Sequence, residues 1–283
     1  MTTFEDYCAI PAVNWSHLKH MADPDGCPEE YLWHQTHQDE DTEAKALGRA
    51  IHVAVLEPDD FPRRYTLWNP KDGTRATNAY KAFAAASEAA GLEVLLKPDY
   101  DKCLAVRDAV HAHPVAAGLL TGGQSEVTIT WTDPATGLPC KARLDYLRPD
   151  MLVDLKSTVS INNRLFGIKV AKMKHHCQLA HYHNGLGLTA DVAANPGPVK
   201  IIAVKQKPPH VVSVVNVPDD ALYAGEQEVA ELLARVRSCT DSGVWPGRYE
   251  TEQTLELPGW VFQDQQQDEM ELTGLIPAKG GTP

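Results

Sequence analysis

The residues Asp145, Asp154 and Lys156 lie close together in the segment ARLDYLRPDMLVDLKST, residues 142–158. Asp154 and Lys156 are two residues apart, so in a strand they share a face while Leu155 points the other way. A turn at 148–150 would bring Asp145, on the preceding strand, next to that face. Carboxylate oxygens suit Mg²⁺ or Mn²⁺, and such an ion activates water and offsets charge on a phosphate. The pattern therefore predicts metal-assisted chemistry at a phosphate, with Lys156 positioning or deprotonating the attacking water; a salt-bridged pair of surface strands is the alternative.

Several side chains near these three are candidates for supporting roles. Glu126 begins the strand EVTITW and is either a further carboxylate for a metal or a solvated edge residue. Lys141 and Arg143 share a face with Asp145 and are candidates for phosphate contact. The pair His175-His176 is a poor zinc site, because adjacent positions on a helix diverge by about 100 degrees.

Alternation and turn residues predict the sheet that must position these groups. Strands are expected at 126–131, 140–147 and 152–157 as an antiparallel meander, with two more at 199–205 and 210–217. Helical patterns are expected at 13–21, 42–56, 77–90, 99–113, 163–187 and 218–238. The order of these elements predicts an α/β (α+β) fold in which helices flank a central sheet.

Charge is divided unevenly along the 283 residues, whose formal net charge is −12. Residues 155–218 hold eight basic residues and one acidic residue, while both ends of the chain are acidic. The net charge alone argues against nucleic acid as a partner, but the basic segment predicts a local face for it, with Lys169, Lys172 and Lys174 pointing towards Asp154.

Composition excludes several classes of protein. The apolar fraction of 43% and charged fraction of 23% fit a globular chain rather than a disordered, collagenous or coiled-coil one. No apolar run reaches the roughly 20 residues of a membrane helix, so no membrane partner is expected. The start, MTTFEDYCAIPAVNW, has no secretion signal, and the six cysteines form no CxxC pair. These features predict reduced thiols in a cytoplasmic protein.

Four sequence elements occur in the order of a known superfamily. The spacing D145-x8-D154-L-K156 resembles the core of the PD-(D/E)xK nucleases. The helix LGRAIHVAVLEP with His52, and the motif from Gln178 to Tyr182 (Q-x-x-x-Y), are similar to those of RecB-type domains and RecE. The opening YCAIPAVNWSHLKHM and the stretch GLPCKARLDYLRPDMLVDLKST resemble RecE-like (exonuclease VIII) phage and prophage exodeoxyribonucleases, over roughly residues 7–260.

The resemblance implies a fold, an activity and roles for residues. The fold would be a restriction-endonuclease-like mixed sheet with an N-terminal helical region. One domain would span 1–262, mainly helical at 1–120, with the catalytic sheet and helix at 124–217 and a helix and extension at 218–262; residues 263–283 would be a flexible tail. His52, Asp145, Asp154 and the Leu155 carbonyl would hold Mg²⁺ (or Mn²⁺), Lys156 would activate water, and Gln178 and Tyr182 would orient DNA.

The implied activity is exonucleolytic digestion of linear double-stranded DNA from 5′ to 3′, leaving 3′ single strands for recombination. Candidates for contacts with DNA or its 5′-phosphate in the N-terminal region are Ser16, Lys19, Arg49 and Arg75. The resemblance further implies a homo-oligomeric ring, such as a tetramer, and a RecT-type single-strand annealing protein as partner.

Two other functions compete with this one. A Cas4-like or single-strand nuclease of the same superfamily would commonly carry a four-cysteine iron–sulfur cluster, and the late cysteine trio is absent here. A catalytically silent DNA-binding module would keep the basic helix and lose metal ligands.

Overall fold

The structure is a computed structural model of the chain, and it describes residues 3–22, 26–37, 41–70, 75–189 and 196–257. The helices are α1 (Phe4–Ala9), α2 (Trp15–Ala22), α3 (Pro28–Thr36), α4 (Glu43–Leu56), α5 (Phe61–Arg64), α6 (Asn78–Ala89), α7 (Lys97–Ala112), α8 (Pro114–Leu119), α9 (Asn163–Lys172), α10 (His175–Leu188) and α11 (Asp219–Ser242). The strands are β1 (Tyr65–Trp68), β2 (Glu93–Leu96), β3 (Gln124–Thr132), β4 (Pro139–Arg148), β5 (Met151–Thr158), β6 (Val199–Lys205) and β7 (Val212–Val217). The expected tail at 263–283 lies outside the described residues.

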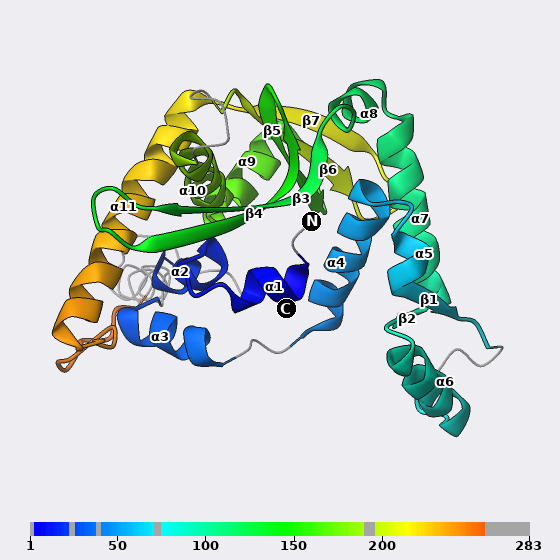
Figure 1. The fold of residues 1–283 in the computed structure, drawn as a ribbon, viewed down its shortest axis with the longest axis horizontal. Coiled ribbons are helices and arrows are strands. Elements are labelled where there is room, and N and C mark those ends of the chain that lie inside the picture. Colours follow the sequence, from blue (N-terminus) through cyan, green and yellow to red (C-terminus); the bar gives the residue numbers. More distant parts are fainter. Residues whose placement is uncertain (1–2, 23–25, 38–40, 71–74, 190–195, 258–283) are drawn as a thin grey trace, which may run out of the picture.

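A five-stranded mixed sheet in the order β3-β4-β5-β6-β7 forms the centre of the molecule. The meander β3-β4-β5 is antiparallel, as the alternation predicted. The chain then crosses through α9 and α10 and returns as β6, which pairs in parallel with β5 before β7 turns back. Figure 1 shows this sheet strongly curved, with α9, α10 and α11 on one side and α4, α7 and α8 on the other. The predicted fold class is confirmed.

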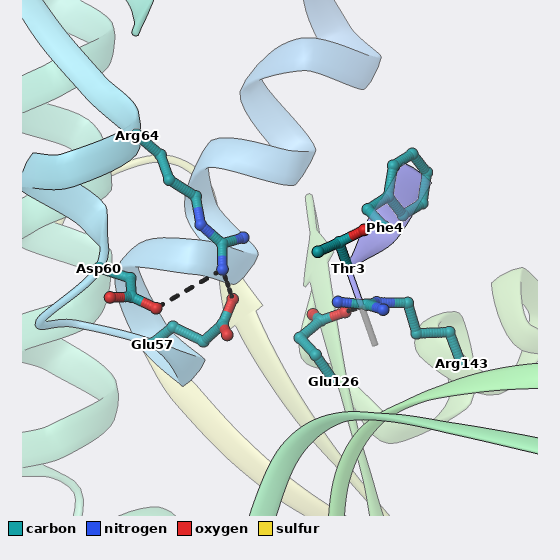
Figure 2. A pocket seen from close by; sticks show the side chains of 7 residues that line it. All are labelled: Thr3, Phe4, Glu57, Asp60, Arg64, Glu126 and Arg143. Carbon is teal, nitrogen blue, oxygen red and sulfur yellow. Dashed lines mark hydrogen bonds and ion pairs between the residues drawn. The ribbon is translucent and has the colours of Figure 1, made fainter. Parts of the chain in front are cut away.

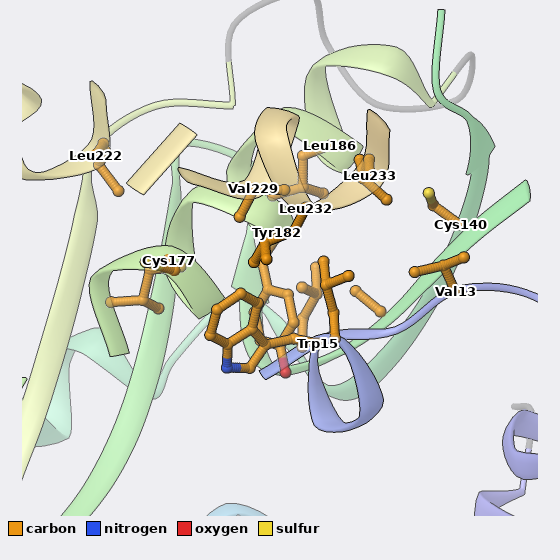
Figure 3. Close-up of a cluster of buried hydrophobic side chains, with 14 of the residues drawn as sticks. Val13, Trp15, Cys140, Cys177, Tyr182, Leu186, Leu222, Val229, Leu232 and Leu233 are labelled. Carbon is orange, nitrogen blue, oxygen red and sulfur yellow. The ribbon is translucent and has the colours of Figure 1, made fainter. Parts of the chain in front are cut away.

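Alternation within the strands divides the apolar core into two clusters. Leu152 and Ile201 belong to the cluster beneath α10 and α11, whereas Leu155 and Ile202 belong to the cluster beneath α4 and α7. Because successive side chains of a strand point to opposite faces, β5 and β6 each contribute to both clusters. Figure 3 shows Trp15, from the N-terminal region, packed with side chains of α10 and α11 in the first cluster.

The prediction of one helical segment over 163–187 is wrong, because the helix is interrupted between α9 and α10. Lys174 there has a left-handed backbone, with φ 53° and ψ 31°, which ends the first helical direction and starts another. The periodicity misses the break because both halves carry apolar residues at helical spacing.

The N-terminal helices pack on the sheet rather than standing apart from it. A backbone bridge joins Val13 to the start of β4, which β5 does not pair with, and the N···O distances are 2.8 Å for Val13 N–H to the Pro139 carbonyl and for Lys141 N–H to the Val13 carbonyl. The two short parallel strands β1 and β2 lie with α6 at the lower right of Figure 1, away from the main sheet. Among the described residues, none of the helices combines the length and apolarity needed to cross a bilayer.

Candidate active site

The separation of β4 and β5 creates the site. Their ladder ends at the pair Tyr146–Val153, and beyond it the strands diverge. The Asp145 carboxylate fills this split, where its Oδ2 accepts a hydrogen bond of 2.7 Å from the Leu155 backbone N–H. The N–H and C=O of one residue lie on the same side of a strand, so the Leu155 carbonyl also faces the split. A carboxylate and a backbone carbonyl therefore share one opening in the sheet.

Asp154 and Lys156 project together from β5 on the side of α10. Lys156 Nζ lies 2.9 Å from both carboxylate oxygens of Asp154 and donates a hydrogen bond to Oδ1. Burial raises the pKa of Asp154 above its usual range, although the Lys156 ammonium opposes this shift. Burial also disfavours the charge on Lys156, but attraction to Asp154 and Asp145 outweighs it and raises the lysine pKa. Lys156 is therefore a charged donor in this arrangement.

His52 and Glu126 approach Asp145 from two other elements. His52, on α4, places Nδ1 3.6 Å from Asp145 Oδ2. Ligand atoms of His52, Glu126 and Asp145 all lie within 4.8 Å of one another. Glu126 has a positive φ of 54°, which interrupts the regular pairing of β3 opposite Asp145. Burial and the nearby Asp145 charge raise the pKa of Glu126 to about 7. An imidazole and two carboxylates thus converge from a helix and two strands.

This donor set fits a divalent metal ion. Asp154 Oδ2 is buried and has no hydrogen-bond partner among the described groups, although the Lys156 ammonium is close. Buried carboxylates that repel one another are costly unless a cation offsets their charge. The candidate ligands (Asp145, Asp154, Glu126, His52 and the Leu155 carbonyl) supply mostly oxygen atoms, which suits Mg²⁺ or Mn²⁺.

Gln178 and Tyr182 connect α10 to the lysine. Gln178 Oε1 accepts a hydrogen bond of 3.1 Å from Lys156 Nζ, and its Nε2 donates to the Tyr182 hydroxyl at 2.8 Å. Tyr182 is buried in the core cluster beneath α10, and this burial raises its pKa well above the ordinary value. The tyrosine therefore positions Gln178 from within the protein, and the amide of Gln178 contacts the lysine directly.

Lys141 is not a phosphate contact, and that expectation is wrong. Its side chain is only 3% exposed, and Nζ donates to the backbone carbonyls of Tyr7, Cys8 and Ile10 at 2.8, 3.1 and 2.7 Å. Alternation placed it on the face of Asp145, but the N-terminal segment covers that part of β4. Lys141 is instead a structural anchor for residues 7–10.

Arg143 lies closer to the site, at one wall of a cavity of about 360 Å³. It forms an ion pair with Glu126 at 2.6 Å. Figure 2 shows Arg64 facing it across the cavity, held by Glu57 at 3.0 Å and Asp60 at 3.6 Å. Glu57 and Arg64 were not among the sequence candidates. The available signal is the acidic residue Glu57, five positions after His52 and directly after the helix expected at 42–56.

The three lysines expected to face Asp154 have different surroundings. Lys169 Nζ donates to the Ser157 carbonyl at 3.1 Å, next to Lys156, and the charge of Lys156 lowers its pKa after the larger effect of burial. Lys172 is exposed on α9. Lys174 forms an ion pair of 2.8 Å with Glu228 of α11. Of these three lysines, only Lys169 is therefore shown beside β5.

The remaining candidates belong to the N-terminal region. Lys19 of α2 is close enough to His175 to lower its pKa, although burial is the main reason that this pKa falls to about 3. Ser16 is exposed on the same helix. Arg49 is paired with Asp41 at 2.6 Å, and Arg75 with Glu43 at 2.8 Å. Lys19 and His175 thus join Lys156 and Lys169 as a group of nitrogen-bearing side chains on one side of the site.

Comparison with known proteins agrees with this geometry. A solved structure from Eubacterium rectale, described as a candidate exonuclease, matches with a TM-score of 0.62 over 93% of this chain and 97% of its own, at 18% identity. That likeness shows a shared fold. No curated protein matches the sequence. The family model described as PDDEXK-like domain of unknown function (DUF3799) matches residues 14–257, which contain the split sheet, the acidic cluster and the α10 motif. The chain therefore belongs to this PDDEXK-like family.

Proposed function

We propose that the protein is a divalent-metal-dependent exodeoxyribonuclease that acts on linear double-stranded DNA. The observation that carries the proposal is the convergence of Asp145, Asp154 and Lys156 at the split between β4 and β5, with His52 beside them. A structural salt bridge would need only Asp154 and Lys156. The additional imidazole and carboxylates concentrate negative charge that an ion pair does not require.

Each side chain has a distinct task in this proposal. Asp145, Asp154 and His52 would hold the metal, with the Leu155 carbonyl and Glu126 as further oxygen donors. A bound Mg²⁺ would supply activation of water and compensation of charge on the scissile phosphate. Lys156, positioned by Asp154 and Gln178, directs its ammonium towards the water or the phosphate. The nearby Lys169 adds positive charge that favours a polyanionic substrate.

We further propose 5′ to 3′ polarity, with 3′ single strands as the product used in recombination. These features, the homo-oligomeric ring and the RecT-type partner rest on the resemblance to RecE-like exonucleases. Light scattering of the purified chain tests the ring, because a monomer at assay concentration would refute it.

The test of activity uses linear duplex DNA labelled at either the 5′ or the 3′ end, with Mg²⁺ and, in parallel, with EDTA. We expect loss of label from the 5′ end only, and no attack on covalently closed circles. Asp154→Asn and Lys156→Ala should abolish digestion, whereas Asp150→Asn, in an exposed turn, and Lys200→Ala, on β6, should retain it. Full activity in the first two variants would refute the assignment.

Substrate preference in this assay and calorimetry of Mg²⁺ binding separate the competing functions. Preference for single-stranded DNA would favour the Cas4-like alternative. Equal rates of digestion from a 5′-hydroxyl end and from a 5′-phosphate end would argue against a pocket for the 5′-phosphate. A silent DNA-binding module would bind duplex and fail to bind Mg²⁺ by calorimetry.

A further inference from the structure

We propose a second metal site, of zinc type, at the junction of α10 and α11. Its ligands are His176, Cys177 and Glu228, and it is independent of the nuclease function proposed above. The three side chains bring one nitrogen, one sulfur and one oxygen within 4.8 Å of one another. This mixture differs from the oxygen-rich catalytic site, because thiolate and imidazole ligands select Zn²⁺ rather than Mg²⁺.

The two short separations in the cluster suit a tetrahedral metal centre. His176 Nε2 lies 3.4 Å from Cys177 Sγ, and Sγ lies 3.2 Å from Glu228 Oε2. Ligand atoms about 2.0–2.3 Å from zinc stand at such separations from one another. His176 and Cys177 are adjacent in α10 and leave the helix axis about 100 degrees apart, but their side chains bend so that Nε2 and Sγ lie 3.4 Å from each other. The fourth position would be taken by water.

Lys174 orients the carboxylate from behind. Its Nζ lies 2.8 Å from Oε1 and 3.0 Å from Oε2 of Glu228, so the ammonium can keep Oε1 while Oε2 binds a metal. Such outer partners hold metal-ligating carboxylates in place. Lys174 reaches this position from a left-handed backbone conformation that non-glycine residues adopt at a cost. Lys174 therefore holds the Glu228 carboxylate in place and leaves Oε2 available to bind a metal ion.

Helices α10 and α11 pack closely beside the three ligands. Gly225 of α11 approaches α10 so closely that a Cβ there would lie 2.6 Å from the His176 carbonyl oxygen. Cys177 is fully buried, while His176 and Glu228 are partly exposed, which leaves access for an ion. His176 Nδ1 is buried without a hydrogen-bond partner within the described part of the chain. The close packing of the helices thus brings the three ligands together without an ion.

Metal binding would displace the thiol proton of Cys177 and would link α10 to α11. The Cys177 thiol, which donates to Glu228 here, loses its proton to solvent, and the thiolate then bonds to Zn²⁺. Cys177 directly precedes Gln178, the residue that contacts Lys156. A metal at this junction would therefore fix the first turn of α10 on which the amide of Gln178 depends.

The experiment is a cobalt titration of the chelator-stripped full chain in saturating Mg²⁺. Co²⁺ bound to a thiolate gives a near-ultraviolet sulfur-to-cobalt charge-transfer band, which the sulfur-free catalytic site cannot produce. We expect one equivalent of Co²⁺ to develop the band and Zn²⁺ to remove it. Cys177→Ser should eliminate the band, and Glu228→Gln and His176→Ala should weaken Co²⁺ binding at least tenfold.

Matched controls make the result decisive. Cys8→Ser removes an exposed thiol and should keep the band, as should Asp145→Asn in the catalytic site. Circular dichroism checks that each variant is folded. If Cys177→Ser does not fold, the Co²⁺ affinity of Glu228→Gln provides the test of the site. Absence of the band in the folded wild-type chain, or its persistence unchanged in Glu228→Gln and His176→Ala, would overturn the proposal.

Discussion

The connection from Tyr182 through Gln178 to Lys156 makes a quantitative prediction. Tyr182→Phe removes only the hydroxyl that accepts from Gln178 Nε2 at 2.8 Å and leaves the buried ring in place. A neutral hydrogen bond contributes about 0.5–1.5 kcal/mol, so nuclease kcat/KM should fall about 2- to 13-fold. Gln178→Leu also removes the acceptor of the charged Lys156 Nζ. At about 1.5–3 kcal/mol for such a bond, its loss should lower kcat/KM about 13- to 160-fold.

The double variant distinguishes positioning from direct contact. If Tyr182 acts only through Gln178, then Tyr182→Phe in the Gln178→Leu background should cost nothing further, because the hydroxyl has lost its partner. The assay is initial-rate digestion of end-labelled duplex, with thermal unfolding to show that all three variants remain folded. If the two substitutions instead lower kcat/KM by factors that multiply, Tyr182 does not act only through Gln178. That result would favour a direct contact between Tyr182 and DNA, as the resemblance implied.

Three further predictions concern stability. Lys141→Met removes three charge-assisted hydrogen bonds, each contributing about 1.5–3 kcal/mol before the desolvation of the lysine is subtracted. Residues 3–10 should therefore lose protection in hydrogen exchange while the sheet retains it. His181 is buried and neutral, and burial lowers its pKa from 6.5 to about 4. Its stabilisation is fully present above pH 6.5 and should be lost, by about 3 kcal/mol, as the pH falls to 4, because only the unfolded chain takes up the proton. His181→Asn, which keeps an N–H donor, should flatten this dependence in urea unfolding measured across pH. Gly225→Ala forces a Cβ against the His176 carbonyl and should cost about 1–3 kcal/mol by the same measurement.

Each stability prediction has a control and a contrary outcome. Lys200→Met changes a lysine on β6 and should leave N-terminal exchange unchanged; an equal effect of both lysine variants would contradict the anchor. For the pH dependence, His183→Asn on the same helix is the matched change. An unchanged slope in His181→Asn would mean that other groups carry the effect. Gly187→Ala, where a Cβ meets no atom within 4 Å, is the control for Gly225.

The sequence by itself determined the elements in which local pattern and burial agree. The three meander strands and the shared face of Asp154 and Lys156 follow from a period of two, which depends only on backbone geometry. The position of His52 on an apolar helix and of Gln178 and Tyr182 four residues apart was equally readable. The spacing of residues in the sequence does not predict how closely α4, β3 and β5 approach one another, because that depends on how the helices pack on a curved sheet.

Tertiary structure alone decided which polar side chains are buried in structural contacts and which line the site. Lys141 and Arg143 have the same alternation and the same charge, yet the N-terminal segment buries one ammonium while the other cation lines a cavity. Lys169 and Lys174 belong to one basic run, but the left-handed turn at Lys174 directs the second towards Glu228. The meeting of His176, Cys177 and Glu228 likewise joins residues about fifty positions apart. Sequence pattern specifies which face of an element a side chain occupies, and only packing specifies what covers that face.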